Sequence, residues 1–204
     1  MTERLEPERT ALLLFDLLNV HVKKDEPTRA RYAPVIANVQ RLQEAARARG
    51  MLVAYAMASH RADGATSALL RTDTDTRLRP WGPEGPDRRP VVAGGTPEAQ
   101  VVDELAPRPN EYLIPKYRWS AFHQTYLELA LRRRGITTIV LVGGTTEIGI
   151  ASTAYAARDL DFDLVIVSDA CSSALMEDHD HFMRRVFPRL SRVRTTDQVL
   201  AMVG

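Results

Sequence analysis

Residues Ile136–Thr153 read I-T-T-I-V-L-V-G-G-T-T-E-I-G-I-A-S-T, and this stretch decides the fold. Its first half is an unbroken run of apolar and β-branched residues, which predicts a strand buried on both faces. Gly143 and Gly144 end that strand, and Thr145 or Thr146 can cap the helix that follows. In an open parallel sheet, ligands collect at the carboxyl ends of the strands, where the next helix presents free N–H groups. We therefore predict a site at this turn.

The rest of the chain repeats the same alternation of strand and helix. Parallel strands need crossover connections of one hand, so repeated strand–helix units indicate a sheet that is covered on both faces. We predict an α/β protein with a three-layer, Rossmann-like fold and a mainly parallel sheet of about six strands. Besides the opening stretch, strands are predicted at 11–15, 51–57, 111–115, 164–167 and in a closing strand–helix unit at 193–203. Helices are predicted at about 34–50, 97–105, 120–135, from the turn after residue 144 to about 160, and at 179–186, with a polar loop at 19–31.

Composition limits the domain count and the kind of partner. The chain has 204 residues, 45% hydrophobic and 26% charged, which suits one domain spanning residues 1–204. Lys plus Arg (27) nearly balances Asp plus Glu (26), so the overall charge favours neither nucleic acid nor an anionic membrane. We expect the partner to be a small molecule or a protein.

Targeting and cofactor signals are weak. The first ten residues are charged and no run of about 18 apolar residues occurs, so we expect a cytoplasmic protein without a membrane span. Cys171 is the single cysteine, which excludes an internal disulfide and a multi-cysteine metal site. The histidines lack a recognised ligand spacing, and the glycine pairs lack the G-x-G-x-x-G spacing of a dinucleotide loop. We predict no metal and no cofactor.

Two charged residues follow predicted strands and are expected at the same edge of the sheet. Asp16 follows the strand at 11–15, and Lys116 follows the strand at 111–115. In a cleft of low dielectric, a carboxylate and an ammonium stabilise each other's charge, and together they can move a proton and hold a substrate oxygen. The alternatives are a structural ion pair, or an Asp16 that only caps the next turn.

Two further features have both a functional and a structural interpretation. His60 follows the strand at 51–57 and is either a ligand contact or a loop residue bonded to backbone. The segment 63–95 shows little periodicity and much Pro, Gly, Asp and Arg, which favours a lid or a subunit contact. Trp81 either anchors that lid or packs the loop down.

Four motifs, taken together, carry a family resemblance. From about Thr10 to Val203 the chain resembles the isochorismatase-like, or cysteine hydrolase, superfamily, which includes nicotinamidases, carbamoylsarcosine amidohydrolases and isochorismatases. The resemblance implies a parallel sheet near six strands, a homodimer or homotetramer, and a triad of Asp, Lys and Cys in which the Asp activates a Cys nucleophile. The motifs are the strand ending at Asp16, G-G-T-P-E-A at 94–99, P-K-Y-R-W-S-A-F at 115–122 and V-G-G-T-T-E-I-G at 142–149.

The chain departs from the family pattern at two positions. The family's G-x-x-T-x-x-C-V places Gly149 where the nucleophilic cysteine stands, so no thiol is available there. Cys171, in S-D-A-C-S-S, matches a non-catalytic cysteine of the family, and buried cysteines act mostly as small hydrophobes. Leu18 replaces the Gln or Asn of the family's D-x-Q or D-x-N, with Asn19 as the nearest polar neighbour. Losing the nucleophile removes acyl-enzyme chemistry but leaves acid catalysis.

The resemblance implies a specific chemistry for such a site. Isochorismatases of siderophore and phenazine pathways are similar in carrying Gly at this position, and they hydrolyse a vinyl ether with the Asp as acid–base group. The leading hypothesis is a small-molecule hydrolase without a Cys nucleophile, with Asp16 as acid/base and Lys116 as its partner, acting on a vinyl ether or a related C–O or C–N bond. The alternative is an inactive family member that binds a small molecule or a protein.

The pocket of this hypothesis surrounds the turn after the 136–142 strand. The resemblance implies a cis peptide bond before Thr145, and N–H groups around the turn can hold an oxyanion or a carboxylate. Isochorismate is a dianion, and the acidic Glu147 would be unfavourable beside it. The sequence therefore does not identify the substrate. The residues expected to line the pocket are Gly144, Thr145, Thr146, Glu147, Gly149, His60 and Trp119.

Overall fold

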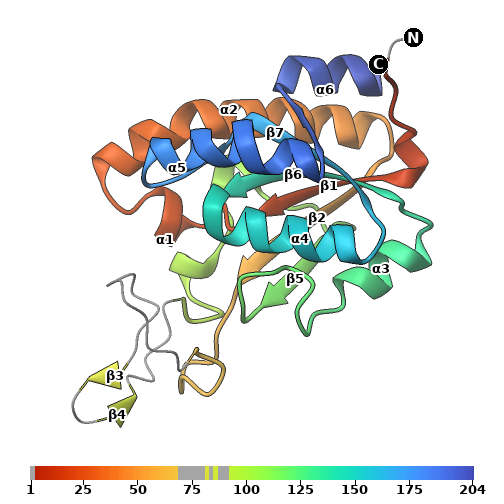
Figure 1. Cartoon of the computed structure of the whole chain (residues 1–204). Helices are drawn as coiled ribbons and strands as arrows, with labels where there is room; N and C mark the ends of the chain where they lie inside the picture. Colours follow the sequence, from red (N-terminus) through yellow and green to blue (C-terminus); the bar gives the residue numbers. More distant parts are fainter. Residues whose placement is uncertain (1–2, 69–80, 83–84, 87–91) are drawn as a thin grey trace.

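The computed structural model describes residues 3–68, 81–82, 85–86 and 92–204, and its centre is a six-stranded sheet (Figure 1). The strand order is β5-β2-β1-β6-β7-β8, and every neighbouring pair is parallel. The prediction of a Rossmann-like α/β fold with about six strands is confirmed. A separate antiparallel pair consists of β3 (Trp81–Gly82) and β4 (Gly85–Pro86). The strands of the main sheet are β1 (Thr10–Phe15), β2 (Leu52–Ala58), β5 (Tyr112–Lys116), β6 (Thr138–Gly144), β7 (Asp163–Ser172) and β8 (Arg192–Arg194).

Helices cover both faces of the sheet (Figure 1). Alternate residues of β1 enter different cores: Leu14 belongs to the core that holds Val39 of α2 and Val199 of α6, whereas Leu13 belongs to the core that holds Leu131 of α3 and Ala154 of α4. Because both faces are covered, the central strands are continuous apolar runs. The helices are α1 (Asn19–Val22), α2 (Glu26–Ala48), α3 (Leu127–Arg133), α4 (Ala151–Asp159), α5 (Met176–His181) and α6 (Thr196–Val203).

The strand order places a topological switch point between β1 and β6. From β1 the chain moves outward through β2 to β5, and it then returns to β6 on the other side of β1. The connections on the two sides of such a point diverge, and open α/β sheets bind their ligands there, at the carboxyl ends of the strands. Asp16 and the two glycines that end β6 lie at that edge, as the sequence predicts.

The first long helix begins earlier than predicted. Helix α2 starts at Glu26 rather than near residue 34, because the side chain of Asp25 accepts a hydrogen bond from the N–H of Thr28 at 2.8 Å and caps the helix. Pro34 therefore lies inside the helix. The predicted polar loop at 19–31 is wrong for a second reason, since α1 occupies Asn19–Val22.

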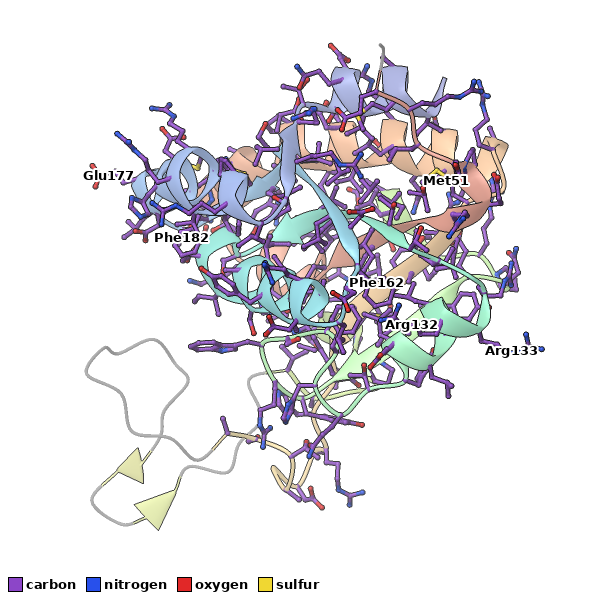
Figure 2. The ribbon with its side chains drawn as sticks, turned by 45° about the vertical axis from the view of Figure 1, so that its right-hand side comes forward. Met51, Arg132, Arg133, Phe162, Glu177 and Phe182 are labelled. Carbon is purple, nitrogen blue, oxygen red and sulfur yellow. The ribbon has the colours of Figure 1, made fainter. Side chains whose placement is uncertain are left out.

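The helix predicted at 120–135 begins late, at Leu127. Ser120 Oγ accepts a hydrogen bond from the N–H of Phe122 at 3.1 Å, and Thr125 Oγ1 accepts one from the N–H of Leu127 at 3.2 Å. Such local side-chain bonds stabilise turns in competition with a helix. The arginine-rich end of α3 contacts the residue before β7: Arg132 lies over the ring of Phe162, 4.2 Å from its centroid (Figure 2).

The helix predicted at 97–105 is broken, whereas the helix predicted at 179–186 is confirmed. The segment 97–105 forms two 3₁₀ turns, Pro97–Ala99 and Asp103–Leu105, because its middle bonds to the chain after β1, with the N–H of Val102 donating to Leu17 O at 3.0 Å. The segment predicted as a helix at 179–186 is the end of α5 followed by a π-helix at Phe182–Val186.

Much of the predicted lid or subunit contact at 63–95 lies outside the described residues, and so does the side chain of Trp81. Within the described part of the chain, no helix is long and apolar enough to cross a membrane.

Candidate active site

Asp16 lies at the carboxyl end of β1 and is held by the end of β2. Its backbone has φ 49°, in the left-handed region, and its N–H donates to Ala56 O at 2.9 Å. One carboxylate oxygen, Oδ1, accepts a hydrogen bond from the N–H of Ala58 at 2.8 Å. Asp16 does not cap α1, whose N-cap residue is Leu18 with no side-chain cap. The left-handed backbone of Asp16 and the hydrogen bond from Ala58 together direct its carboxylate toward the end of β2.

Lys116 ends β5 and forms an ion pair with Asp16. Its Nζ donates to Asp16 Oδ2 at 2.6 Å, and the two side chains are only 5% and 13% exposed. The same Nζ lies 4.4 Å from the centroid of the Phe15 ring, which adds a cation–π contact. A carboxylate and an ammonium this close and this buried hold each other in a fixed position.

The end of β6 and the turn that follows it are built for close approach of backbone. Gly143 has φ 122°, and a Cβ there would lie 2.1 Å from Phe15 O in β1, so only glycine fits. A Cβ on Gly144 would lie 2.3 Å from the hydroxyl of Tyr32. The Gly144–Thr145 peptide bond is cis, the feature that the family resemblance implies.

The segment after this turn is a π-helix, Thr146–Ile150, that leads into α4. Neither candidate threonine caps it through its side chain: the N-cap is Thr145 without a side-chain bond, and Thr146 Oγ1 instead lies 2.9 Å from Nδ1 of His179. Burial lowers the pKa of His179 from its ordinary value, which keeps this imidazole neutral near pH 7. The Thr146 side chain therefore ties the turn to α5.

Glu147 and Tyr32 add polar atoms beside the turn. Within the described residues, Oε2 of Glu147 is buried and has no hydrogen-bond partner. Burial raises the pKa of Tyr32, and the charges of Asp16 and Glu147 raise it further, so its hydroxyl keeps its proton. An acceptor without a partner and a protonated hydroxyl are groups that a bound molecule can pair with.

His60 and Trp119, the two predicted pocket residues outside the 144–149 segment, have different environments. His60 Nδ1 lies 3.1 Å from the backbone O of Thr66, which agrees with the interpretation of His60 as a loop residue bonded to backbone. Burial lowers the pKa of His60. The Lys116 and Asp16 charges also act on that pKa, so His60 is still within electrostatic reach of the pair. Trp119 is 48% exposed.

Cys171 is inert as a nucleophile in this fold. It lies within β7, paired with Gly143 of β6, and its Sγ is 3.9 Å from Leu141 O. Burial raises the pKa of the thiol to about 12, so almost no thiolate forms near neutral pH. Among the residues whose placement the structure gives, no group of three His, Cys, Asp or Glu side chains is arranged to hold a metal ion.

Four residues at or beside the site carried no sequence signal. His21 lies in α1, and both Asp16 and Lys116 act on its pKa, which burial lowers. Phe15 stands under Lys116, Tyr32 abuts Gly144, and His179 bonds to Thr146. His21, Tyr32 and His179 are brought there by α1, α2 and α5, whereas Phe15 is the last residue of β1, where the sequence predicts only a buried strand position.

The fold and these side chains define a Rossmann-like α/β protein with a charged site at its topological switch point. The model of the isochorismatase domain matches residues 10–198. The chain belongs to the isochorismatase family.

The similar proteins agree with this assignment. YwoC of Bacillus subtilis strain 168, described as an uncharacterized isochorismatase family protein, is 32% identical over 99% of this chain and 98% of its own length. Enterobactin synthase component B of Escherichia coli K12 is 29% identical over 96% of this chain, which spans 64% of that protein. The structure of an isochorismatase family protein from Burkholderia thailandensis superimposes with a TM-score of 0.78, at 32% identity over 99% of each chain.

Proposed function

We propose that this chain hydrolyses a small molecule without a cysteine nucleophile, with Asp16 as acid/base and Lys116 as its partner. The observation that supports this most is the buried Asp16–Lys116 pair, 2.6 Å between Nζ and Oδ2, at the switch point of the sheet. The match to a component of enterobactin synthase, an enzyme by its name, also supports an enzymatic role. The bond cleaved is a vinyl ether or a related C–O or C–N bond.

The contacts of Asp16 suit proton transfer. Lys116 occupies one side of Oδ2 and the Ala58 N–H occupies one side of Oδ1, yet a carboxylate has about four acceptor positions, so each oxygen keeps one for a substrate or a water. When Asp16 gives a proton to the substrate, the ammonium of Lys116 stabilises the carboxylate that remains.

For a vinyl ether the steps balance without a covalent enzyme intermediate. Asp16 protonates the terminal vinyl carbon, and water adds to the cationic carbon that bears the ether oxygen. The added water gives one proton to the Asp16 carboxylate, and the neutral hemiketal that results separates into a carbonyl compound and an alcohol. None of these steps needs a thiol, which fits a chain with Gly149 at the nucleophile position and an inert Cys171.

A hydrolysis screen read by mass spectrometry tests the proposal. Wild type, Asp16→Asn and Cys171→Ala receive isochorismate, small vinyl ethers, nicotinamide and other carboxamides. We expect turnover of one substrate class, lost by a factor of about 10²–10⁴ in Asp16→Asn and unchanged in Cys171→Ala. Turnover that survives in a well-folded Asp16→Asn contradicts the mechanism.

The second candidate is a family member that binds a small molecule or a protein without turning it over, and the missing thiol at Gly149 is the observation that favours it. Tight binding of a panel compound, with no product formed and no change in affinity in Asp16→Asn, would establish the binder and exclude the hydrolase.

A further inference from the structure

We propose that Phe15 closes the covalent route in this chain, because its ring fills the space that a nucleophilic side chain at residue 149 needs. The glycine at 149 and the phenylalanine at 15 then fit each other, and introducing cysteine at 149 alone does not create a nucleophile. This inference rests on the proposed function, since it takes residue 149 as the family's nucleophile position.

The ring and the glycine are in direct conflict with any side chain at 149. A Cβ on Gly149 would lie 2.2 Å from Cε1, 2.6 Å from Cζ and 3.1 Å from Cδ1 of Phe15. Carbon atoms in contact sit roughly 3.5–4.0 Å apart, so the ring has to move. It has little freedom to do so: Phe15 is 1% exposed and its ring lies under Lys116 Nζ.

The backbone gives no other reason for a glycine at this position. Gly149 lies inside the π-helix that precedes α4 and does not have the positive φ of Gly143. In a helical segment, alanine is favoured over glycine, so the residue is retained at a cost to local stability. Space for the Phe15 ring is what requires it.

The space that Phe15 fills borders the catalytic pair. The ring centroid is 4.4 Å from Lys116 Nζ, and Asp16 is the next residue along the chain. A thiol at 149 with the outer ring atoms removed would point toward this pair. Attack of that thiol on an ester would form a thioester, release the alcohol portion and pass the thiol proton to the Asp16 carboxylate.

The steric part is tested by a thermal double-mutant cycle. Phe15→Leu deletes Cε1 and Cζ, the two ring atoms nearest the position that a Cβ of residue 149 would take, and leaves the inner part of the side chain. We expect Gly149→Ala to lower Tm by about 4 °C or more in the wild-type background, where it overpacks the site, and to raise it by about 2 °C in Phe15→Leu. The same shift in both backgrounds would overturn the inference. If Phe15→Leu does not fold, Phe15→Met repeats the cycle with a flexible, unbranched side chain.

The chemical part needs no known substrate. Gly149→Cys is compared in the wild-type and Phe15→Leu backgrounds for alkylation by iodoacetamide and for the release of p-nitrophenolate from p-nitrophenyl acetate, with buried Cys171 as the internal unreactive thiol. We expect the introduced thiol to react at least about tenfold faster in the Phe15→Leu background, and its acylation to fall in a further Asp16→Asn variant. Equal reactivity in both backgrounds contradicts the inference.

These readouts separate the two proposals. If the proposed hydrolase function fails, wild type shows no turnover in the screen, while the Tm cycle and the thiol reactivity still report on Phe15. If the inference about Phe15 fails, the cycle shows no change of sign, while wild-type turnover and its loss in Asp16→Asn are unaffected.

Discussion

Lys116→Met removes the charge that faces Asp16 while keeping a long apolar side chain in place. At 2.6 Å and an effective dielectric of about 20, the attraction between the two charges is on the order of 6 kcal/mol. Part of it is offset by the cost of burying both groups, which are 5% and 13% exposed. Because the variant leaves a carboxylate buried without its cation, we expect the free energy of unfolding to fall by about 3 kcal/mol, or about 6–12 °C in Tm.

A double-mutant cycle separates the pair from other losses. Lys116→Met also loses the contact with the Phe15 ring, but that loss occurs with and without Asp16→Asn and therefore cancels. The double variant has no buried charge at the pair and keeps an acceptor for the Ala58 N–H, so we expect it to recover much of the lost stability. The expected coupling energy is about 2–3 kcal/mol, measured by urea unfolding at neutral pH.

The exposed pair Asp180–Arg184 is the matched control. Its N–O distance is 3.0 Å, but its side chains are 52% and 74% exposed, and the expected coupling is about 0.3–0.5 kcal/mol. Raising the salt to about 1 M should weaken this surface coupling and leave the buried one nearly unchanged. A coupling for Asp16 and Lys116 no larger than the control, or one that salt removes, would refute the reasoning.

Three other predictions follow from burial and capping. Iodoacetamide at about pH 8 should leave Cys171 of the native chain unmodified while it labels the denatured chain fully, because burial raises the thiol pKa to about 12; rapid native labelling contradicts this. Burial lowers the His179 pKa below the ordinary 6.5, so the unfolded chain binds a proton that the folded chain does not, and stability is lost as pH falls below about 7. His179→Asn should therefore reduce the drop in urea midpoint between about pH 7.5 and 5.5, and an unchanged drop would exclude His179 as its source. Thr195→Ala removes the capping-box bond of α6 that Thr195 Oγ1 accepts from the N–H of Gln198 and should cost about 1 kcal/mol, or about 2–4 °C in Tm; Gln198→Ala removes the other bond, which the N–H of Thr195 donates to Gln198 Oε1, and the double variant should cost more than either alone.

Most strand ends could be predicted from the sequence to within a few residues. Each central strand is buried on both faces, so its whole length must be apolar, and that pattern is visible without any knowledge of its neighbours. The exception is β7, which runs on to Ser172 because Cys171 and Ser172 pair with the glycines that end β6. Pairing of this kind leaves no periodic signal.

The helix starts were less predictable, because they depend on which short polar side chain bonds to which backbone group. Asp25 starts α2 well before Pro34, and Ser120 turns the chain where a helix was expected to begin. A cap and a turn use the same residue types, and the sequence does not distinguish them.

Asp16 and Lys116 could be found because the end of a buried parallel strand is a position that chain order alone defines. Their 2.6 Å contact, in contrast, depends on β5, β2 and β1 lying in that order in the sheet.

The alternation of elements can be read from the sequence alone, and so can the charged residues at strand ends and the absence of a thiol at 149, since these are properties of single segments. The tertiary structure decided which side chains meet: the Phe15 ring against Gly149, the Tyr32 hydroxyl against Gly144, and His179 against Thr146. These contacts join residues far apart in the chain, and whether a glycine reflects a turn or a neighbour's volume depends on atoms that only the packed fold brings together.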